Sequence, residues 1–188
     1  ATTEIYTLSL HDALRSQQAA PIIIKGLKRL EYRGYDSAGI SVLNGGLNVY
    51  KKMGKVAELE GLLQGETLES TIGMGHTRWA THGEPNDINA HPHLSSSGKL
   101  SIIHNGIIEN YASIKQELLK KGYSFNSETD TEVLVTFIES IQEERKCSLA
   151  KAVRIALNTI VGAYAIVVMS KDNKDLLIAA RKGSPLVA

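Results

Sequence analysis

The sequence predicts an α+β domain with antiparallel sheets. Segments typical of strands are grouped at residues 38–53 and 163–181, and they do not alternate strictly with segments of helical periodicity. Within the first group, two β-like runs flank Asn44-Gly45-Gly46, which is typical of a hairpin. At 188 residues the chain has the length of one domain with a sizeable core.

The sequence pattern of the N-terminal half predicts two helices and three strands. Residues 1–16 show no clear periodicity, whereas from Gln17 apolar residues recur at helical spacing until Gly34, and Pro21 is acceptable in a first turn. Glycines at 73 and 75 in the last strand indicate close approach by backbone or ligand. The predicted ranges are a helix ending before Gly34, strands at 38–43 and 47–53, a helix at 55–64 and a strand at 71–77.

The C-terminal half predicts three strands and three helices after a long polar loop at residues 78–99, a length usually associated with function or disorder. Ser113 and Gln116 have capping-box spacing at the start of one helix. The last two strands are apolar on both faces, so we expect them to be central in their sheet. The predicted ranges are strands at 100–105, 163–170 and 175–181, and helices at 113–121, 131–145 and 149–161.

Composition excludes several classes of protein. Hydrophobic residues make up 43% and charged residues 22%, and the formal net charge of +1 provides no field for nucleic acid or an anionic membrane. The chain contains no apolar run of membrane-spanning length and no signal-peptide pattern. Its one cysteine, Cys147, excludes an internal disulfide and fits a reducing compartment. We therefore expect a cytoplasmic protein without nucleic-acid or membrane partners.

The stretch HTRWATHGEPNDINAHPH, residues 76–93, has too few apolar residues for a core segment. One interpretation is a metal site, in which Asp87 could add an oxygen ligand. The four histidines have spacings of six, nine and two, which match neither a zincin helix nor a zinc finger, so no metal is expected. These histidines are His76, His82, His91 and His93.

The second interpretation of this stretch is a binding site for a small polar molecule. Arg78 offers a planar fork of donors for a carboxylate, and Trp79 offers a flat apolar wall. Thr81 and His82 could add polar contacts, and Gly83 permits close approach of the backbone. The structural alternative is that Arg78 pairs with an acid and Trp79 fills the core; composition alone leaves both open.

Two further motifs fit an amino-acid ligand. The side chain of Asn105 and the N–H of Gly106 provide two donors that can converge on an oxyanion, although Asn-Gly is also a common turn. Asp130 precedes a helix and could hold an ammonium group. Alternatively, Thr129, Asp130 or Thr131 could simply cap that helix.

No residue has the sequence context of an activated nucleophile. Cys147 follows a charged helix end with no histidine nearby, so we interpret it as structural. Ser37 and Ser184 lie in no nucleophile-elbow pattern. The residues alone thus predict an amino-acid pocket with an oxyanion hole.

Six ordered motifs together resemble a known family, the N-terminal glutaminase domains of glucosamine-6-phosphate synthases, which are class II, Ntn-type glutamine amidotransferases. The resemblance covers residues 17–188, nearly the whole chain. The motifs are LKRLEYRGYDSAGI, GHTRWATHG, NAHPH, HNGIIEN, SETDTEV and RKGSPLV. The family fold is the Ntn-hydrolase αββα sandwich with two antiparallel sheets.

The resemblance implies roles for the pocket residues. Arg78 would hold the carboxylate of L-glutamine and Asp130 its ammonium group. Asn105 and Gly106 would form the oxyanion hole, and Gly106 would also belong to the pocket. The remaining pocket residues implied by the resemblance are Arg33, which supports the nucleophile region, Trp79, which lies over the pocket, and Thr81 and His82 in its wall.

The resemblance also implies a reaction and partners. An N-terminal cysteine attacks the glutamine amide, and the released ammonia passes to sugar isomerase domains that make glucosamine-6-phosphate. The family needs no cofactor for this glutaminase step, and its full-length members are expected to be homodimers.

The sequence departs from the family at the nucleophile. Counting back without gaps from Gln17, the expected cysteine falls at Leu8, and residues 1–16 match no family motif. We interpret this segment as a non-native addition to a truncated amidotransferase domain that lacks the sugar isomerase domains. The resulting hypothesis is a chain that does not hydrolyse glutamine, and the alternative is a non-catalytic, glutamine-binding pseudo-amidotransferase module.

Overall fold

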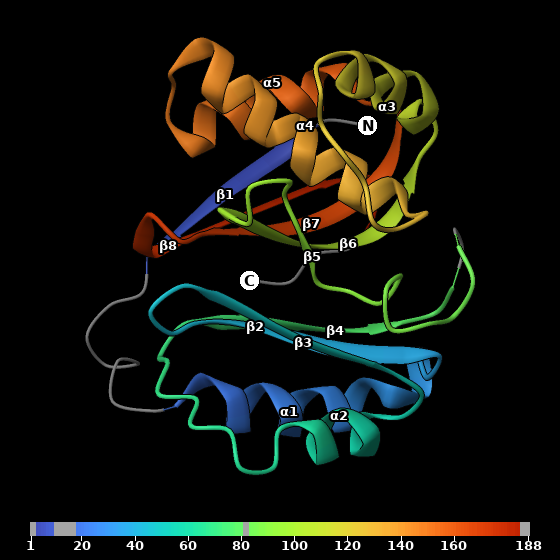
Figure 1. Cartoon of the computed structure of the whole chain (residues 1–188), viewed down its shortest axis with the longest axis vertical. Coiled ribbons are helices and arrows are strands. Elements are labelled where there is room, and N and C mark those ends of the chain that lie inside the picture. Colours follow the sequence, from blue (N-terminus) through green and yellow to red (C-terminus); the bar gives the residue numbers. More distant parts are fainter. Residues whose placement is uncertain (1–2, 10–17, 81–82, 185–188) are drawn as a thin grey trace.

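The computed structural model describes residues 3–9, 18–80 and 83–184 and arranges them in four layers (Figure 1). Helices cover the outer faces of two sheets, and the inner faces of the sheets oppose each other. The named strands pair antiparallel in both sheets. The predicted α+β class and the αββα sandwich with two antiparallel sheets are confirmed.

The smaller sheet has the strand order β3-β2-β4 and is covered by α1 and α2. Ala38, Ile40 and Val42 of β2 are buried beneath these helices. Gly75 of β4 lies so close to Ile23 of α1 that a Cβ atom there would overlap the isoleucine side chain, so glycine lets the helix approach the sheet. The elements are α1 (Ala19–Leu30), the 3₁₀ helix η2 (Glu31–Arg33), β2 (Ser37–Leu43), β3 (Leu47–Met53), α2 (Val56–Leu62) and β4 (Gly73–Arg78).

The larger sheet has the strand order β1-β8-β7-β6-β5 and is covered by α3, α4 and α5. The two apolar strands β7 and β8 are central, as predicted, and their side chains join the largest apolar core. The elements are β1 (Glu4–Ser9), β5 (His93–Leu94), β6 (Leu100–Ile108), α3 (Tyr111–Lys120), α4 (Asp130–Arg145), α5 (Leu149–Thr159), β7 (Gly162–Ser170) and β8 (Asn173–Lys182).

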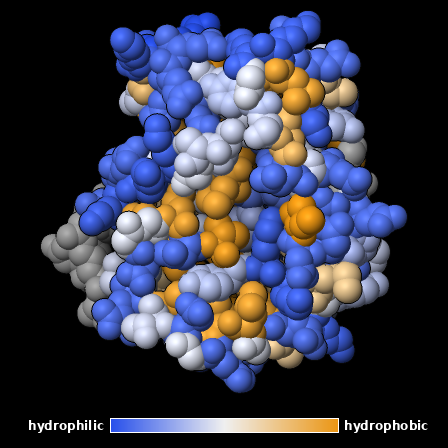
Figure 2. All heavy atoms as spheres, viewed as in Figure 1, coloured by the Kyte–Doolittle hydropathy of each residue, from blue (hydrophilic) through white to orange (hydrophobic). Residues whose placement is uncertain are grey.

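The surface follows from this layering. In the view of Figure 2, hydrophobic residues gather mainly across the middle of the molecule, where the sheets lie, whereas the helical end at the top is mostly hydrophilic. No helix within residues 18–80 and 83–184 has both the length and the apolar character that crossing a membrane requires.

One strand was not predicted, and two local predictions were wrong. Residues 4–9, which show no periodicity, form β1, because hydrogen bonding to β8 does not depend on side-chain pattern. The predicted loop 78–99 contains the short strand β5. Helix α3 begins at Tyr111, so Ser113 is not its cap; its hydroxyl donates to the carbonyl of Asn110 at 2.9 Å instead.

Candidate functional site

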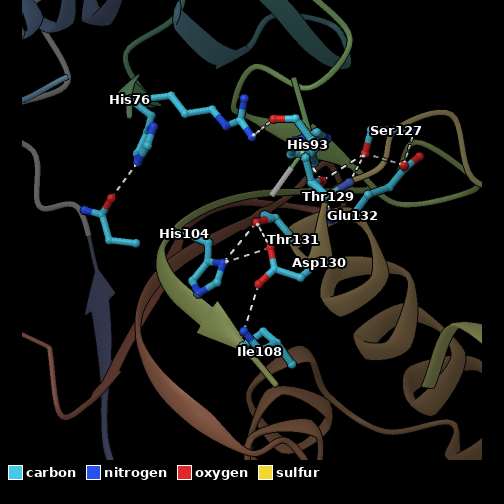
Figure 3. Close-up of polar contacts among 12 residues, drawn as sticks. His76, His93, His104, Ile108, Ser127, Thr129, Asp130, Thr131 and Glu132 are labelled. Atoms are coloured by element: carbon cyan, nitrogen blue, oxygen red, sulfur yellow. Dashed lines mark hydrogen bonds and ion pairs between the residues drawn. The ribbon is translucent and has the colours of Figure 1, made fainter. Parts of the chain in front are cut away.

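A cavity of about 350 Å³ lies between β4, β6 and the N-terminus of α4. Because successive side chains of a strand alternate between its faces, the buried side chains of Met74, His76 and Arg78 in β4 all point between the sheets. Figure 3 shows the polar side chains that approach this region from β4, β6 and α4. The lining residues are Arg33, His76, Thr77, Arg78, Trp79, His91, His104, Asn105, Gly106, Ile107, Thr129, Asp130 and Thr131.

Arg78 is 4% exposed at the end of β4. Its Nη2 donates to the carbonyl of Gly83 at 3.2 Å. Burial lowers the pKa of Arg78, while the carboxylates of Asp36 and Asp130 raise it. Because an arginine keeps its proton in proteins, the cavity wall carries a fixed positive charge.

Asp130 is the first residue of α4 and is buried in the cavity wall. The cap itself is Thr129, whose hydroxyl accepts from the N–H of Glu132 at 3.2 Å, which resolves the three alternatives for the N-cap. The Asp130 carboxylate accepts from the N–H of Ile108 at 2.8 Å and from the Thr131 hydroxyl at 3.3 Å (Figure 3). These bonds hold a negative charge on the side of the cavity formed by α4.

Asn105 and Gly106 lie in β6 and both line the cavity. Gly106 has φ +134, and a Cβ atom there would overlap the carbonyl oxygen of Ala163 on β7. Only glycine fits this position. Because both residues pair with β7, the Asn-Gly pair lies within a strand and is not a plain turn. The Oδ1 atom of Asn105 lies 2.8 Å from Nε2 of His76 on the opposite sheet.

Three of the four candidate metal-ligating histidines, His76, His91 and His93, are buried and in ring contact. The ring centroids of His76 and His91 are 4.5 Å apart, and those of His91 and His93 are 4.9 Å apart. Burial lowers the pKa of His76 to about 4 and lowers the pKa of the other two well below 6.5, so all three are neutral at pH 7. Among the residues that the structure describes, no group of three or more His, Cys, Asp or Glu side chains could hold a metal ion.

The loop that carries two of these histidines is fastened to β3. The ammonium group of Lys51 donates to the carbonyls of Ile88 and Ala90 at 2.7 and 2.9 Å. Asp87, the proposed oxygen ligand, instead forms an ion pair with Lys52 at 2.8 Å. Residues 89–93 are buried, so the prediction that the stretch 76–93 lies outside the core was wrong for these five residues, whereas residues 83–88 are exposed or half-buried. Two polar side chains of residues 89–93 find partners: the Asn89 amide donates to the Glu84 carbonyl, and Nε2 of His93 lies 3.2 Å from the Thr129 hydroxyl at the start of α4.

Trp79 and Arg33 stand at the exposed rim of the cavity. Trp79 is 60% exposed, which contradicts the alternative that it fills the core. Its ring packs edge-on against Tyr35, with centroids 5.4 Å apart. Arg33 is exposed at the end of η2. Two other predicted pocket residues, Thr81 and His82, lie outside the described residues.

The backbone does not bring Leu8 to this cavity. In the larger sheet, Asn105 pairs with Ala165, which pairs with Arg181, which pairs with Glu4. Leu8 lies four positions beyond Glu4 along β1, a shift of about 13 Å at the usual rise per residue. Leu8, where the resemblance to the family places the nucleophilic cysteine, is therefore displaced from Asn105 in this structure.

The thiol of the chain is also remote from the cavity. Cys147 follows the C-terminal end of α4, whose N-terminal residue is Asp130. A helix of 16 residues spans about 24 Å. Cys147 is partly buried against the apolar core, as its structural interpretation predicted.

The role of His104 was not predicted from the sequence. Its Nδ1 lies 2.9 Å from the hydroxyl of Thr131, which contacts Asp130, so His104 supports the α4 side of the cavity. The available signal was its position directly before Asn105. Because neighbouring strand residues point to opposite faces, His104 faces α4 while Asn105 faces β4. Although Thr131 belongs to the cavity lining, its side chain has no exposed surface and its hydroxyl is engaged by His104 and Asp130.

The fold that brings these charged and amide groups to one cavity is that of the Ntn-type amidotransferases. Residues 48–184 match the family described as glutamine amidotransferase domain, and the chain belongs to this family. Curated relatives named glutamine–fructose-6-phosphate aminotransferase (isomerizing) include a protein of Bacteroides thetaiotaomicron, 58% identical over 173 residues, and one of Chlorobaculum tepidum, 54% identical over 175 residues. Each comparison covers 91% of this chain, which spans 28% of the length of either relative.

Solved structures show the same fold at lower identity. One is the glutamine phosphoribosylpyrophosphate amidotransferase of B. subtilis complexed with ADP and GMP, with a TM-score of 0.70 and 26% identity over 95% of this chain and 41% of that one. Another is described as the allosteric regulatory enzyme of purine biosynthesis, with a TM-score of 0.73 and 25% identity over the same shares.

Proposed function

We propose that this chain binds L-glutamine in the cavity between β4, β6 and α4, as the glutamine-binding part of a glutamine–fructose-6-phosphate aminotransferase. The observation that carries this proposal is the presence, on one cavity of about 350 Å³, of a buried cation, a buried carboxylate and an amide-glycine pair. That volume is at the lower end of ligand pockets, which span about 300–1,000 Å³, and suits a small amino acid.

The charges of the cavity match the two ends of an α-amino acid. The Arg78 guanidinium binds the carboxylate with its planar fork of donors. The Asp130 carboxylate binds the ammonium group, and the hydrogen bond from the Ile108 N–H holds this carboxylate in place. The Asn105 amide and the Gly106 N–H then receive the side-chain carbonyl oxygen of glutamine. Trp79 closes over the ligand, and Arg33, Thr81 and His82 complete the pocket.

In the complete enzyme we propose that this domain supplies ammonia to sugar isomerase domains for the synthesis of glucosamine-6-phosphate, in the cytoplasm and as a homodimer. The names of the curated relatives support the acceptor sugar phosphate in this proposal. The glutaminase step itself requires no cofactor.

For the chain as given, we propose binding of glutamine without hydrolysis. A glutaminase of this family needs a thiol beside the oxyanion hole, and Cys147 follows the far end of α4, a helix that spans about 24 Å from Asp130. This supports the second candidate function, a non-catalytic glutamine-binding module. Measurement of ammonia release decides between an active glutaminase and a non-catalytic binding module, because release well above a blank without protein would show that a nucleophile is present.

Isothermal titration calorimetry with L-glutamine tests the binding proposal. We expect saturable binding by the chain and at least a 100-fold weaker affinity for Arg78→Met, because a charge-assisted, bidentate contact is lost. Arg78→Lys keeps the charge without the fork and should lie between the two. The matched control is Arg154→Met on the exposed face of α5, which should bind like the unaltered chain. Absence of glutamine binding by the unaltered chain would overturn the proposal.

A further inference from the structure

The amide of Asn105 can serve an oxyanion hole in only one of its two orientations. Rotation of the side-chain amide by half a turn exchanges its NH₂ group, which donates, with Oδ1, which accepts. Asn105 lies on an exposed part of β6, where solvent alone would not distinguish these orientations. A neighbouring group that binds Oδ1 would direct the NH₂ group toward the cavity.

His76 is such a neighbour. Its Nε2 lies 2.8 Å from Oδ1 of Asn105, on the facing sheet. An amide oxygen only accepts, so Nε2 must carry the ring proton. Burial lowers the pKa of His76 to about 4, so the ring has a single proton at pH 7 and Nδ1 is bare. The opposite tautomer would bury an N–H group without a partner, because Nδ1 has none among the described residues.

The ring of His76 is itself held in place. The side chain is 9% exposed and lies between the two sheets. The ring of His91 packs against it with centroids 4.5 Å apart, and the His91 backbone lies directly on Gly39 of β2, where any side chain would overlap the His91 carbonyl oxygen. A glycine on β2 and a packed ring thus fix the donor that faces Asn105.

We propose that His76 is a positioning residue that binds Oδ1 of Asn105 and thereby turns the Asn105 NH₂ group toward the side-chain carbonyl oxygen of glutamine. The inference rests on the proposed glutamine site. It assigns to His76 a part in the selectivity for a ligand that has a side-chain carbonyl group. His76 acts through Asn105 and touches no reacting atom.

The test compares two ligands on the full chain. L-Norvaline has the α-amino-acid group and the side-chain length of glutamine but no amide, so the ratio of the two dissociation constants measures the contact to the carbonyl. We expect His76→Phe to weaken glutamine binding about fivefold to tenfold, the loss of about one hydrogen bond, with little change for norvaline. His76→Gln retains an N–H donor and should restore the ratio. His93→Phe, in the same ring stack but without contact to Asn105, should leave the ratio unchanged.

The outcomes separate this inference from the proposed function. If the unaltered chain prefers glutamine and His76→Phe keeps the same preference, or weakens both ligands equally, the positioning role is overturned and the glutamine site stands. If the unaltered chain binds neither ligand, the proposed function itself fails. Should His76→Phe not fold, ¹⁵N NMR of the unaltered chain decides: an Nε2–H tautomer of His76 supports the inference, and an Nδ1–H tautomer overturns it.

Discussion

The layer between the two sheets has an apolar end and a polar end. The apolar end consists of Ile72, Met74 and Met169, with partly buried leucine, isoleucine and valine side chains packed around them. The polar end begins one inward-facing residue further along β4, at His76, and continues to Arg78 at the cavity. A single strand thus passes from core to binding site within six residues.

This difference shows how the sandwich supports a buried site. Apolar side chains at one end hold the sheets together through packing. The polar end buries imidazole nitrogens, which lose their hydrogen bonds to water on folding. The nitrogen Nδ1 of both His76 and His91 lacks a partner among the described residues. Such groups cost folding free energy. We infer that the apolar end stabilises the geometry that the polar end uses for binding.

The largest expected effect breaks the apolar end. Met169→Ala removes a fully buried side chain and should lower the free energy of unfolding by about 2–5 kcal/mol, as large-to-small core substitutions do. Urea denaturation measures this loss. Met53→Ala, at a half-exposed methionine of β3, is the matched control and should change stability by less than about 0.5 kcal/mol. If the two ends have separate roles, folded Met169→Ala retains its glutamine affinity; a parallel loss of affinity would contradict this separation.

The second effect is a loss of stability at acidic pH, which the buried histidines of the polar end should cause. Because burial lowers the pKa of His76 to about 4, below its ordinary 6.5, the unfolded chain binds a proton between these pH values that the folded chain does not. Stability should therefore fall as the pH falls from 6.5 towards 4, by up to about 1.4 kcal/mol per pH unit for each such histidine. Urea midpoints at pH 7 and pH 5 measure this slope.

A variant isolates the contribution of one ring. The pKa of His91 is also lowered by burial, and a phenylalanine at that position does not titrate. His91→Phe should therefore show a shallower dependence of stability on pH between 7 and 5 than the unaltered chain. An identical slope in the two proteins would show that His91 is protonated in the folded state or does not contribute.

The smallest expected effect on stability comes from the surface contacts that Asp87 makes with β3. Asp87→Ala removes an acceptor for the Met53 N–H at 2.6 Å and an ion pair with Lys52, both on the surface. We expect a loss of about 1 kcal/mol, because hydrogen bonds contribute about that much and exposed ion pairs less. Asp87→Asn keeps an acceptor and should cost less. Equal losses in both variants would assign the effect to the ion pair instead.

Much of the fold could be predicted from the sequence because the relevant signals are local. The hairpin of β2 and β3 follows from two β-like runs around Asn44-Gly45-Gly46, and the central place of β7 and β8 follows from their apolar residues on both faces. The strand β1 could not be predicted, because its pairing with β8 joins residues at opposite ends of the chain.

The candidate site was predictable in its residues but not in its geometry. The residue types at Arg78 and Asp130 indicated an amino-acid ligand, and the motif resemblance assigned their roles. The contact between His76 and Asn105 joins facing sheets and leaves no trace in sequence spacing. The exposure of Trp79 and the burial of residues 89–93 likewise depended on which polar groups found partners after folding.

The sequence by itself determined the fold class, the family and the residue types of the pocket, because these depend on periodicity, turn chemistry and motifs within short stretches. Only the tertiary structure decided which of these residues meet. It stacked three histidines in a neutral, buried row and placed one of them against Asn105. It also left Leu8 three strands away from that asparagine and offset by about 13 Å along the strand direction. The physical reason is that burial and register are properties of paired strands and packed layers, which no single segment contains.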